Sequence, residues 1–294
     1  MGRNSRHLAG LRTAYEAVKA ACAKDWSSSA AGDAIFRLAD LSLRFLSTIC
    51  VPIELVSKVP GKEYVGYANR GARGTVSRPA NRALFLGDAE RLSKLWGNWS
   101  AGTGQTNDWA MMSYTVALAP CLAMELFDRQ NKKGPATYFE CLIGHIFART
   151  LRCNPRKQAS FPVQGRSVRL TMDFLFDRPG GVGIHLPVKM STRERVVQAW
   201  AHQRILDGAF GEGAYKGVMV LFSETKLDSR SHEVVEICVP DQWLIYQTLL
   251  AKMVRIYYFD VPPRYQALTA AHPSLIQIKQ FGDFFTERAA ILGA

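Results

Sequence analysis

The chain has 294 residues, of which 48% are hydrophobic, and its formal net charge is +12. This length and composition are those of an ordinary globular protein that buries a large core, either as one domain or as a core with a smaller recognition domain. The positive charge predicts a polyanionic partner, because Lys and Arg side chains that neutralise DNA phosphates release counterions. RNA and an anionic membrane surface fit the charge alone equally well.

Two further classes of protein are not expected. The charged amino terminus is followed by no apolar segment of the kind that a signal peptide requires. The most apolar run, Trp109 to Met124, is too short to span a membrane and contains several polar residues, so it predicts a core helix, kinked at Pro120. The six cysteines show no CxxC spacing and indicate buried, reduced thiols in a cytosolic protein.

The amino-terminal part is predicted to be mainly helical. Helical spacing of apolar residues predicts helices over 8–23, over 33–49 with Asp33 as the cap, and over 88–96. Between them, the stretch 67–85 contains no acidic residue and four arginines, Arg70, Arg73, Arg78 and Arg82. Such a stretch can follow a phosphate backbone, although a merely solvated basic loop is an equally good interpretation.

The chemistry-bearing residues are expected farther along. A helix over 136–149 carries Glu140 near its first turn, and alternating apolar residues over 168–177 predict a strand that contains Asp173. A turn at 178–181 leads to a strand over 182–189 that ends on Lys189. Asp173 is a stronger candidate ligand than Asp177, because an uncompensated carboxylate inside a strand is costly to bury. Two carboxylates that can bind Mg²⁺ and a lysine that can contact the attacked phosphate are the kinds of residue that hydrolyse a phosphodiester.

Lys189 is followed closely by a helix, which Ser191 or Thr192 can cap. Its first turn contains Arg193, Glu194 and Arg195, although the helix dipole disfavours cations there. Arginine forks onto guanine N7 and O6 and glutamate accepts from cytosine N4, so this triplet can recognise G·C pairs. The alternative interpretation is a solvated, charged helix start.

The remaining pattern completes the fold. Apolar runs predict strands over 217–223, 234–239 and 254–259, and helices are expected over 240–250 and 274–292. The order of helix, hairpin, helix, strand, strand, helix and strand predicts an α/β (α+β) fold with a mixed central sheet flanked by helices. The predicted division is a helical region over 1–130, for DNA recognition or dimerisation, and a core over 131–294.

The combination of Glu140, Asp173 and Lys189 resembles the PD-(D/E)xK nuclease superfamily. More narrowly, Lys-Met-Ser-Thr-Arg-Glu-Arg over 189–195, followed by Gln198, is similar to the EcoRII-like type II restriction endonucleases that cut CCGG, CCNGG or CCWGG cores. The resemblance covers roughly residues 137–265. It implies a restriction-endonuclease-like fold, Mg²⁺ bound by Asp173 and Glu140, a lysine that stabilises the attacked phosphate, and base recognition by the triplet, with Gln198 in support of recognition or packing.

Some positions depart from the family pattern. Asp173 follows Met172 rather than proline, at a position where many members of the family vary, and Pro187 occupies the usual place of the second acidic residue. EcoRII-like enzymes restore that carboxylate thirteen residues after the lysine, where this chain has His202, with Gln203 beside it. Either side chain can coordinate weakly or hold a metal-bound water, and a plain core or surface role is an equally good interpretation of each.

These features lead to one main hypothesis and two rivals. The main hypothesis is a cytoplasmic, prokaryotic type II restriction endonuclease, a homodimer that requires Mg²⁺, acts on double-stranded DNA rather than at a membrane, and cuts a palindrome with a CCGG-type core to leave 5′ overhangs. The first rival is a structure-directed repair or recombination nuclease, and the second is a catalytically degenerate DNA-binding protein. The sequence does not specify the outer bases, a central spacer or an oligomer beyond a dimer.

Overall fold

The computed structural model describes residues 3–70, 76–127, 133–178, 180–191, 196–228 and 230–293, with the backbone only for 3–7. The chain divides into two compact units, which are described separately below. The first unit comprises Met1–Leu142 and Thr225–Ile237, and the second comprises Ile143–Glu224 and Cys238–Ala294. The boundary therefore lies inside a helix, past the predicted division at 130/131, and a later segment of the chain returns to the first unit.

Helices dominate the first unit, as the sequence predicts. They are α1 (Arg3–Lys24), α2 (Ser29–Ile49), α3 (Ala89–Ser100), α4 (Thr106–Phe127) and the beginning of α5 (Gly134–Leu151). The predicted cap of α2 is wrong, because Ser28 accepts a hydrogen bond from the Ala31 N–H and Asp33 lies inside the helix. The other predicted start is confirmed: Asp88 caps α3.

The apolar helix α4 is a core element. It is long and apolar enough to cross a membrane by length and composition alone, but 83% of its most apolar window is buried inside the protein. Pro120 lies within this helix. All six cysteines are free thiols, and five of them are buried.

Two small sheets complete the first unit. One contains β1 (Cys50–Glu54), β3 (Tyr64–Asn69) and β4 (Ala80–Asn81), and the other contains β10 (Thr225–Leu227), β11 (Glu233–Glu236) and β2 (Val56–Ser57). The prediction that 234–239 joins the central sheet is wrong. Instead, β11 pairs with β10 and β2, because Val234 packs into a small apolar cluster with Leu55, Val59 and Tyr64.

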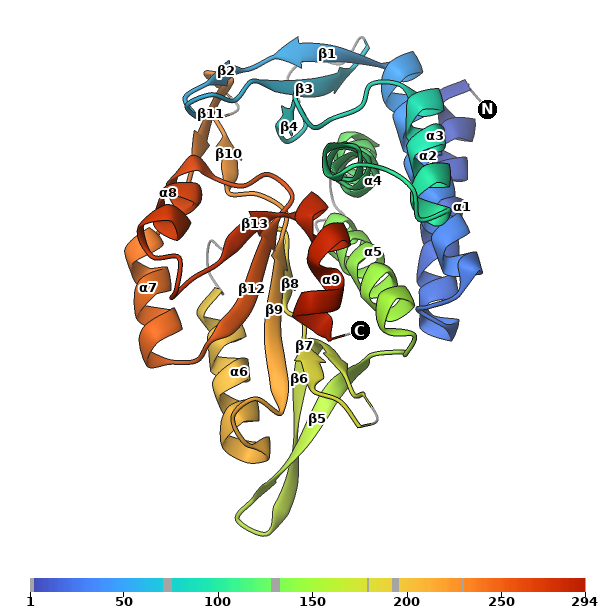
Figure 1. Cartoon of the computed structure of the whole chain (residues 1–294). Coiled ribbons are helices and arrows are strands. Elements are labelled where there is room, and N and C mark those ends of the chain that lie inside the picture. The colour runs from blue at the N-terminus through green and yellow to red at the C-terminus, as the bar shows by residue number, and fades with distance from the viewer. Residues whose placement is uncertain are drawn as a thin grey trace. The chain divides into compact units, whose positions relative to one another are not determined.

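The second unit is built on a mixed central sheet (Figure 1). Its strand order is β13 (Ile278–Gln280), β12 (Met253–Tyr258), β9 (Tyr215–Leu221), β7 (Gly183–His185), β6 (Arg166–Phe176) and β5 (Arg156–Val163), with β8 (Val188–Lys189) also paired to β9. The pairs β5–β6 and β6–β7 are antiparallel, and the others are parallel. The apolar run of β9 is buried on both faces from Gly217 onward, as a strand inside a helix-covered sheet requires.

Helices cover both faces of this sheet. On one face, α6 (Val196–Phe210), α7 (Pro240–Leu249) and α8 (Pro263–Ala271) pack around Trp200, Trp243 and Tyr265. On the other face, the ring of Phe147 of α5 stacks on that of Phe284 of α9 (Phe284–Leu292), with 4.7 Å between the ring centroids. It also contacts the ring of Phe176 of β6.

Two sequence predictions about this unit are wrong. The predicted helix over 274–292 consists of β13, a 3₁₀ turn (Phe281–Asp283) and the shorter α9. A strand that the sequence does not predict, β5, precedes β6, so the long hairpin is β5–β6 rather than the pair 168–177 and 182–189. Only Leu175 and Phe176 of β6 pair with β7.

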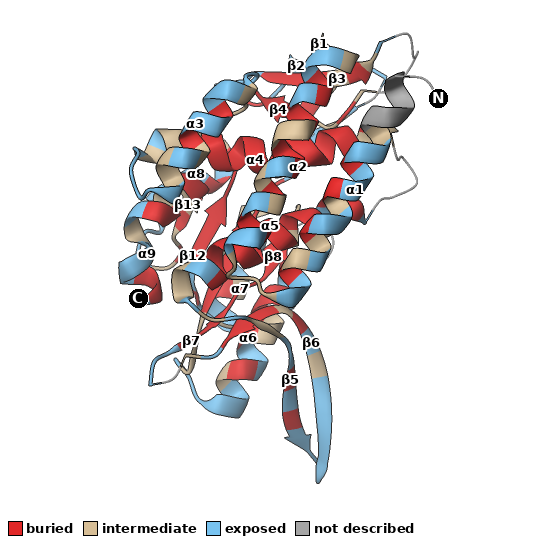
Figure 2. Cartoon of the chain, turned by 90° about the vertical axis from the view of Figure 1, so that its right-hand side faces the viewer, coloured by how far each residue is buried: buried red, intermediate tan, exposed pale blue. Residues whose placement is uncertain are grey.

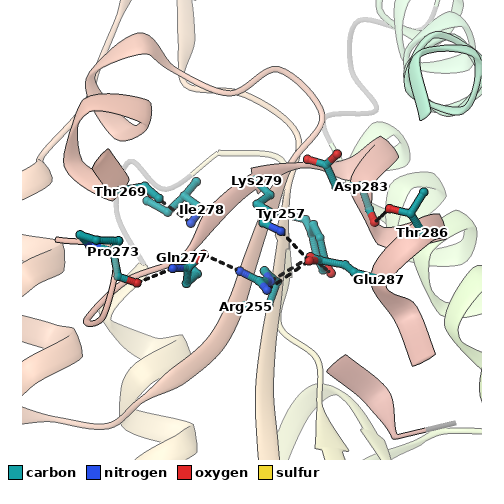
Figure 3. A network of polar contacts seen from close by, with 10 residues as sticks. All are labelled: Arg255, Tyr257, Thr269, Pro273, Gln277, Ile278, Lys279, Asp283, Thr286 and Glu287. Atoms are coloured by element: carbon teal, nitrogen blue, oxygen red, sulfur yellow. Dashed lines mark hydrogen bonds and ion pairs between the residues drawn. The ribbon is translucent and has the colours of Figure 1, made fainter. Parts of the chain in front are cut away.

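The polar network of Figure 3 attaches α9 to the sheet. Glu287 of α9 accepts hydrogen bonds from Tyr257 Oη at 2.7 Å, from Lys279 Nζ at 2.6 Å and from Arg255 Nη2 at 3.2 Å, and its Oε1 lies 2.9 Å from Arg255 Nε. Burial, together with the nearby Glu287, raises the pKa of the Tyr257 phenol. Tyr257 therefore keeps the proton that it donates to Glu287 at neutral pH, and the network holds the last helix in place.

Candidate active site

The candidate site centres on the ion pair between Asp173 of β6 and Lys189 of β8. Lys189 Nζ lies 2.7 Å from Asp173 Oδ2, and the backbone N–H of Val188 donates to the same oxygen at 2.9 Å. The two side chains are 21% and 25% exposed, so the pair is shielded yet open to a ligand. Among the described residues, both donors to this carboxylate use Oδ2. The other oxygen, Oδ1, is therefore available for a cation.

A break in the strand sequence produces this geometry. The predicted strand 182–189 is two short strands, β7 and β8, separated by Leu186 and Pro187. Proline has no N–H and accepts only, here from Val220 N at 2.9 Å. Beyond it, Val188 pairs with Val220 and Lys189 with Leu221, so the N–H of Val188 turns to Asp173. The side chain of Pro187 cannot bind a metal, as the sequence predicts. Directly after it, however, the backbone N–H of Val188 donates to the Asp173 carboxylate.

A buried histidine lies beside this pair. His185 is 1% exposed, and its Nδ1 lies 3.0 Å from Gln203 Oε1 of α6. The Gln203 amide nitrogen donates to Tyr215 O at 2.8 Å and to Asp207 Oδ1 at 2.9 Å, so its oxygen faces the imidazole and Nδ1 carries the proton. Burial lowers the pKa of His185 to about 4, although the bond to Gln203 opposes the shift. His185 is therefore neutral at physiological pH.

Gln203 is fixed in this position by its surroundings. It is 2% exposed, and a Cβ at Gly217 would lie only 2.7 Å from its Oε1. Gly217 thus provides the space that the amide occupies. All hydrogen-bonding groups of the Gln203 amide have partners inside the protein, so this side chain positions His185 and does not face a bound metal.

His202 differs from its neighbour in sequence. It is half-buried, and its ring centroid lies 6.3 Å from that of His185. Burial lowers the pKa of His202, while the charge of Asp173 raises it and that of Lys189 lowers it. His202 therefore senses both members of the ion pair, whereas Gln203 faces the core. The exposed Gln198 Nε2 lies 3.4 Å from His202 Nε2.

The other predicted site residues belong to the first unit or lie outside the described residues. Glu140 lies on α5 in the first unit, and it is in the second turn rather than near the first, which contains no acidic residue. Arg78 also belongs to the first unit, where its Nε donates to Glu125 Oε1 at 2.8 Å. Arg73 and the triplet Arg193, Glu194 and Arg195 lie outside the described residues.

Sequence reasoning missed three elements of the site. The Val188 N–H depends on a contact between β8 and β6, and the His185–Gln203 pair and the space at Gly217 depend on contacts between β7, β9 and α6; no local pattern reveals these contacts. A histidine and a glutamine next to apolar residues were the only available signal, and such residues more often satisfy each other inside a core than bind a ligand.

The donor set fits Mg²⁺ chemistry. Among the residues that the structure describes, no three His, Cys, Asp or Glu side chains form a metal-binding group. Mg²⁺ does not need such a cage, since it keeps several waters and binds one or two carboxylates together with substrate phosphates. Asp173 supplies a hard oxygen ligand of that kind next to a lysine that can meet a phosphate.

Solved structures share this fold. No protein-family model matches the sequence, and no curated protein matches it significantly. Both solved structures that match are restriction endonucleases. The particular structure is that of the Type IIP restriction endonuclease Kpn2I, which matches with a TM-score of 0.80 and 21% identity over 95% of this chain and 96% of that chain. A complex of the restriction endonuclease PspGI with substrate DNA matches with a TM-score of 0.41 and 13% identity, over 69% of this chain and 92% of that one.

The match to Kpn2I confirms the predicted fold class. Both chains are covered almost completely, so the helical amino-terminal region and the sheet unit each belong to the shared fold. At this level of identity, the likeness concerns the fold alone.

Proposed function

We propose that this protein is a Mg²⁺-dependent type II restriction endonuclease. The observation that carries the proposal is the Asp173–Lys189 pair, held at 2.7 Å by two strands of a sheet with the restriction endonuclease fold. A fold alone does not define an activity. A partly exposed carboxylate and lysine in direct contact supply the chemistry that phosphodiester hydrolysis needs.

Each residue has a distinct part in the proposed reaction. Asp173, with Glu140 directly or through water, would hold Mg²⁺, which when bound would supply Lewis-acid chemistry at the scissile phosphate. Lys189 stabilises the charge that develops on the attacked phosphate. The Val188 N–H fixes the orientation of the Asp173 carboxylate through Oδ2. His202 stands where similar enzymes have a carboxylate on this helix, and it would accept a hydrogen bond from a water at the metal site or donate one to it.

The proposed specificity rests on the Arg193–Glu194–Arg195 triplet. A homodimer presents two copies of the triplet to a palindrome with a CCGG-type core, in which the arginines contact guanines and Glu194 contacts cytosine amino groups. Gln198 supports this contact, and Arg73 contacts the phosphate backbone, whereas the guanidinium of Arg78 is paired with Glu125. By resemblance to the EcoRII-like group, the products have 5′ overhangs, and the enzyme acts in the cytoplasm.

Incubation of the purified protein with a long plasmid and Mg²⁺ tests the proposal. Discrete bands are expected, and sequencing of the cut ends gives the core, the outer bases and the overhang. A smear, or cuts confined to flaps and junctions, would indicate a repair or recombination nuclease. Binding without a product would indicate a catalytically degenerate DNA-binding protein, for which the loss of an acidic residue at Pro187 is the favouring observation.

A second experiment tests recognition separately. Replacing Glu194 by Ala should cost about 1 to 3 kcal/mol per half-site, because the cytosine amino groups lose their acceptor. Titration against cognate and scrambled duplexes in Ca²⁺ measures this loss. A variant that keeps the full preference for cognate DNA would show that the triplet is only a charged helix start.

A further inference from the structure

The long hairpin of β5 and β6 has features that the proposed catalytic chemistry does not use. It pairs in regular register from Gln158↔Thr171 to Val163↔Arg166, and the two-residue turn between the strands, Gln164 and Gly165, has positive φ at both positions. Only the base of β6 continues into the central sheet. In Figure 1 the ribbon of two strands extends beyond the other elements of its unit, and Figure 2 shows that its outer half is largely exposed.

The two faces of this ribbon differ. One face carries Ala159, Phe161 and Leu170, which pack in a cluster with Leu206 of α6, and Phe161 contacts Phe210 at 5.7 Å. The opposite face, termed here the open face, is exposed throughout the cross-strand pairs. Its residues are Gln158, Ser160, Pro162, Ser167, Arg169 and Thr171. No described element covers the open face.

The charge of the ribbon has a single sign. From Arg156 to Thr171 the sequence contains four basic residues and no acidic one. Arg156 is neutralised by Asp177 at 2.6 Å, and Lys157 lies over the Phe174 ring. Arg166 and Arg169 are exposed, and neither forms an ion pair with any residue that the structure describes. Arg169 lies on the open face, next to hydroxyl and amide groups, and Arg166 is exposed at the outer end of the ribbon, on the face of its partner Val163.

We infer that this ribbon binds the DNA phosphate backbone outside the cleavage site, an inference that rests on the proposed function. Hydroxyl, amide and guanidinium groups without carboxylates complement phosphate oxygens. A second copy of the chain is a weaker match for the open face, because interface cores are apolar and depleted in charge. Pro162 is the only apolar side chain on that face.

The strand geometry sets the position of the contact. Arg169 and Arg166 precede Asp173 by four and seven residues on β6, which at about 3.4 Å per residue places them roughly 14 and 24 Å along the strand. A duplex that extends along the ribbon from a phosphate at Asp173 reaches them after about four to seven base pairs, at about 3.4 Å per step. The ribbon therefore contacts flanking DNA, beyond a four-base-pair core, and it does so without regard to sequence.

Binding of duplexes with short and long flanks tests this inference. The double variant Arg166→Ala/Arg169→Ala is compared with wild type and with the control Lys252→Ala/Arg288→Ala, which removes two exposed charges outside the ribbon. The probes are duplexes with the mapped cleavage site and either about two or about twelve flanking base pairs per side, titrated in Ca²⁺ at several salt concentrations. The ribbon variant should lose affinity for the long duplex, with a salt slope lower by roughly 0.9 per lost contact. It should bind and cleave the short duplex like wild type.

Three results would overturn the inference. Equal losses on both duplexes, or none on either, would place the ribbon away from flanking DNA while leaving the nuclease proposal intact. A change in the sedimentation of the free ribbon variant, with DNA affinity unaltered, would assign the ribbon to a protein interface. Absence of DNA binding and cleavage by the wild-type protein would remove the nuclease proposal and the inference together.

Discussion

Two carboxylates of the second unit differ in how their oxygens are used. Glu287 accepts on both oxygens, Oε1 from Tyr257 and Oε2 from Lys279 and Arg255, and its side chain is only 16% exposed. Asp173 also contacts a lysine, but its donors among the described residues all use Oδ2. Both carboxylates form an ion pair with a lysine, but only Asp173 has an oxygen that accepts from no donor among the described residues.

This difference separates stability from chemistry. A carboxylate whose oxygens are both satisfied by its own protein holds elements together, because its removal leaves buried donors without acceptors. A carboxylate with a remaining oxygen, beside a lysine that is 25% exposed, can exchange internal bonds for a cation and a phosphate. The contrast predicts that the Glu287 network determines folding stability, and that the Asp173 pair determines turnover.

The largest expected effect is on stability at the Glu287 network. Glu287→Ala leaves Arg255 in a largely buried position without its partner and should lower the free energy of unfolding by about 4 kcal/mol. Urea unfolding followed by circular dichroism measures the loss. The matched variant Asp228→Ala, at an exposed loop carboxylate, should change stability far less. Equal losses in both variants would remove the contrast between network and surface.

The next effect is a pH dependence of stability. His185 has a folded-state pKa of about 4 against a usual 6.5, so burial favours its neutral form. The stabilisation is complete above pH 6.5 and is lost as the pH falls towards 4, because His185 is then protonated in the unfolded chain but still neutral in the folded chain. The difference between these two pKa values corresponds to about 3 kcal/mol in the free energy of unfolding.

Comparison with a variant isolates this contribution. Unfolding is followed in urea at pH 7.5, 6 and 5 for wild type and for His185→Gln, which cannot titrate. Wild type should lose more stability than the variant over this range. Parallel curves for the two proteins would show that folding does not lower the pKa of His185, so that this histidine takes up a proton in the folded state as it does in the unfolded chain.

The third effect concerns Lys189. Lys189→Ala removes the charge that stabilises the attacked phosphate and should lower the cleavage rate at least about a hundredfold. Binding of cognate DNA in Ca²⁺ should survive. The exposed Lys252→Ala serves as the control and should cleave at the wild-type rate. A Lys189→Ala variant with near-normal cleavage would exclude this lysine from the active site.

The smallest expected effect is on the metal requirement. His202 senses the charges of both Asp173 and Lys189, so His202→Glu adds a negative charge close to the proposed metal site. The Mg²⁺ concentration for half-maximal cleavage should fall several-fold, since affinity for Mg²⁺ rises with ligand charge. Gln203→Glu, which faces the core, should destabilise the fold without this shift. An unchanged Mg²⁺ titration in His202→Glu would place the imidazole outside the metal environment.

Much of the fold was accessible from the sequence because local patterns carry it. Helical spacing predicted α3 and α5, and the apolar runs predicted β9 and β12. The pairing partners were not accessible, because an apolar run does not state which sheet receives it. The run at 234–239 is an example: β11 joins a sheet of the first unit.

The candidate site, like the fold, was predictable from the sequence only where local patterns determine it. Asp173 and Lys189 were predicted from strand patterns and resemblance, and the structure brings them together. The different roles of His202 and Gln203 could not be predicted, because they are adjacent on one helix and only the rotation of α6 against β9 decides which one faces the core. The space at Gly217 that admits the Gln203 amide is likewise a tertiary feature.

The most direct test of the central claim is the rate of plasmid cleavage in Mg²⁺ by Asp173→Asn, measured beside Glu287→Gln at a temperature at which both variants are folded. Both substitutions remove one negative charge with little change in shape. We expect Asp173→Asn to cleave at least about a hundredfold more slowly than wild type, while Glu287→Gln stays near the wild-type rate. Near-normal cleavage by Asp173→Asn would contradict the assignment of the Asp173–Lys189 pair as the active site.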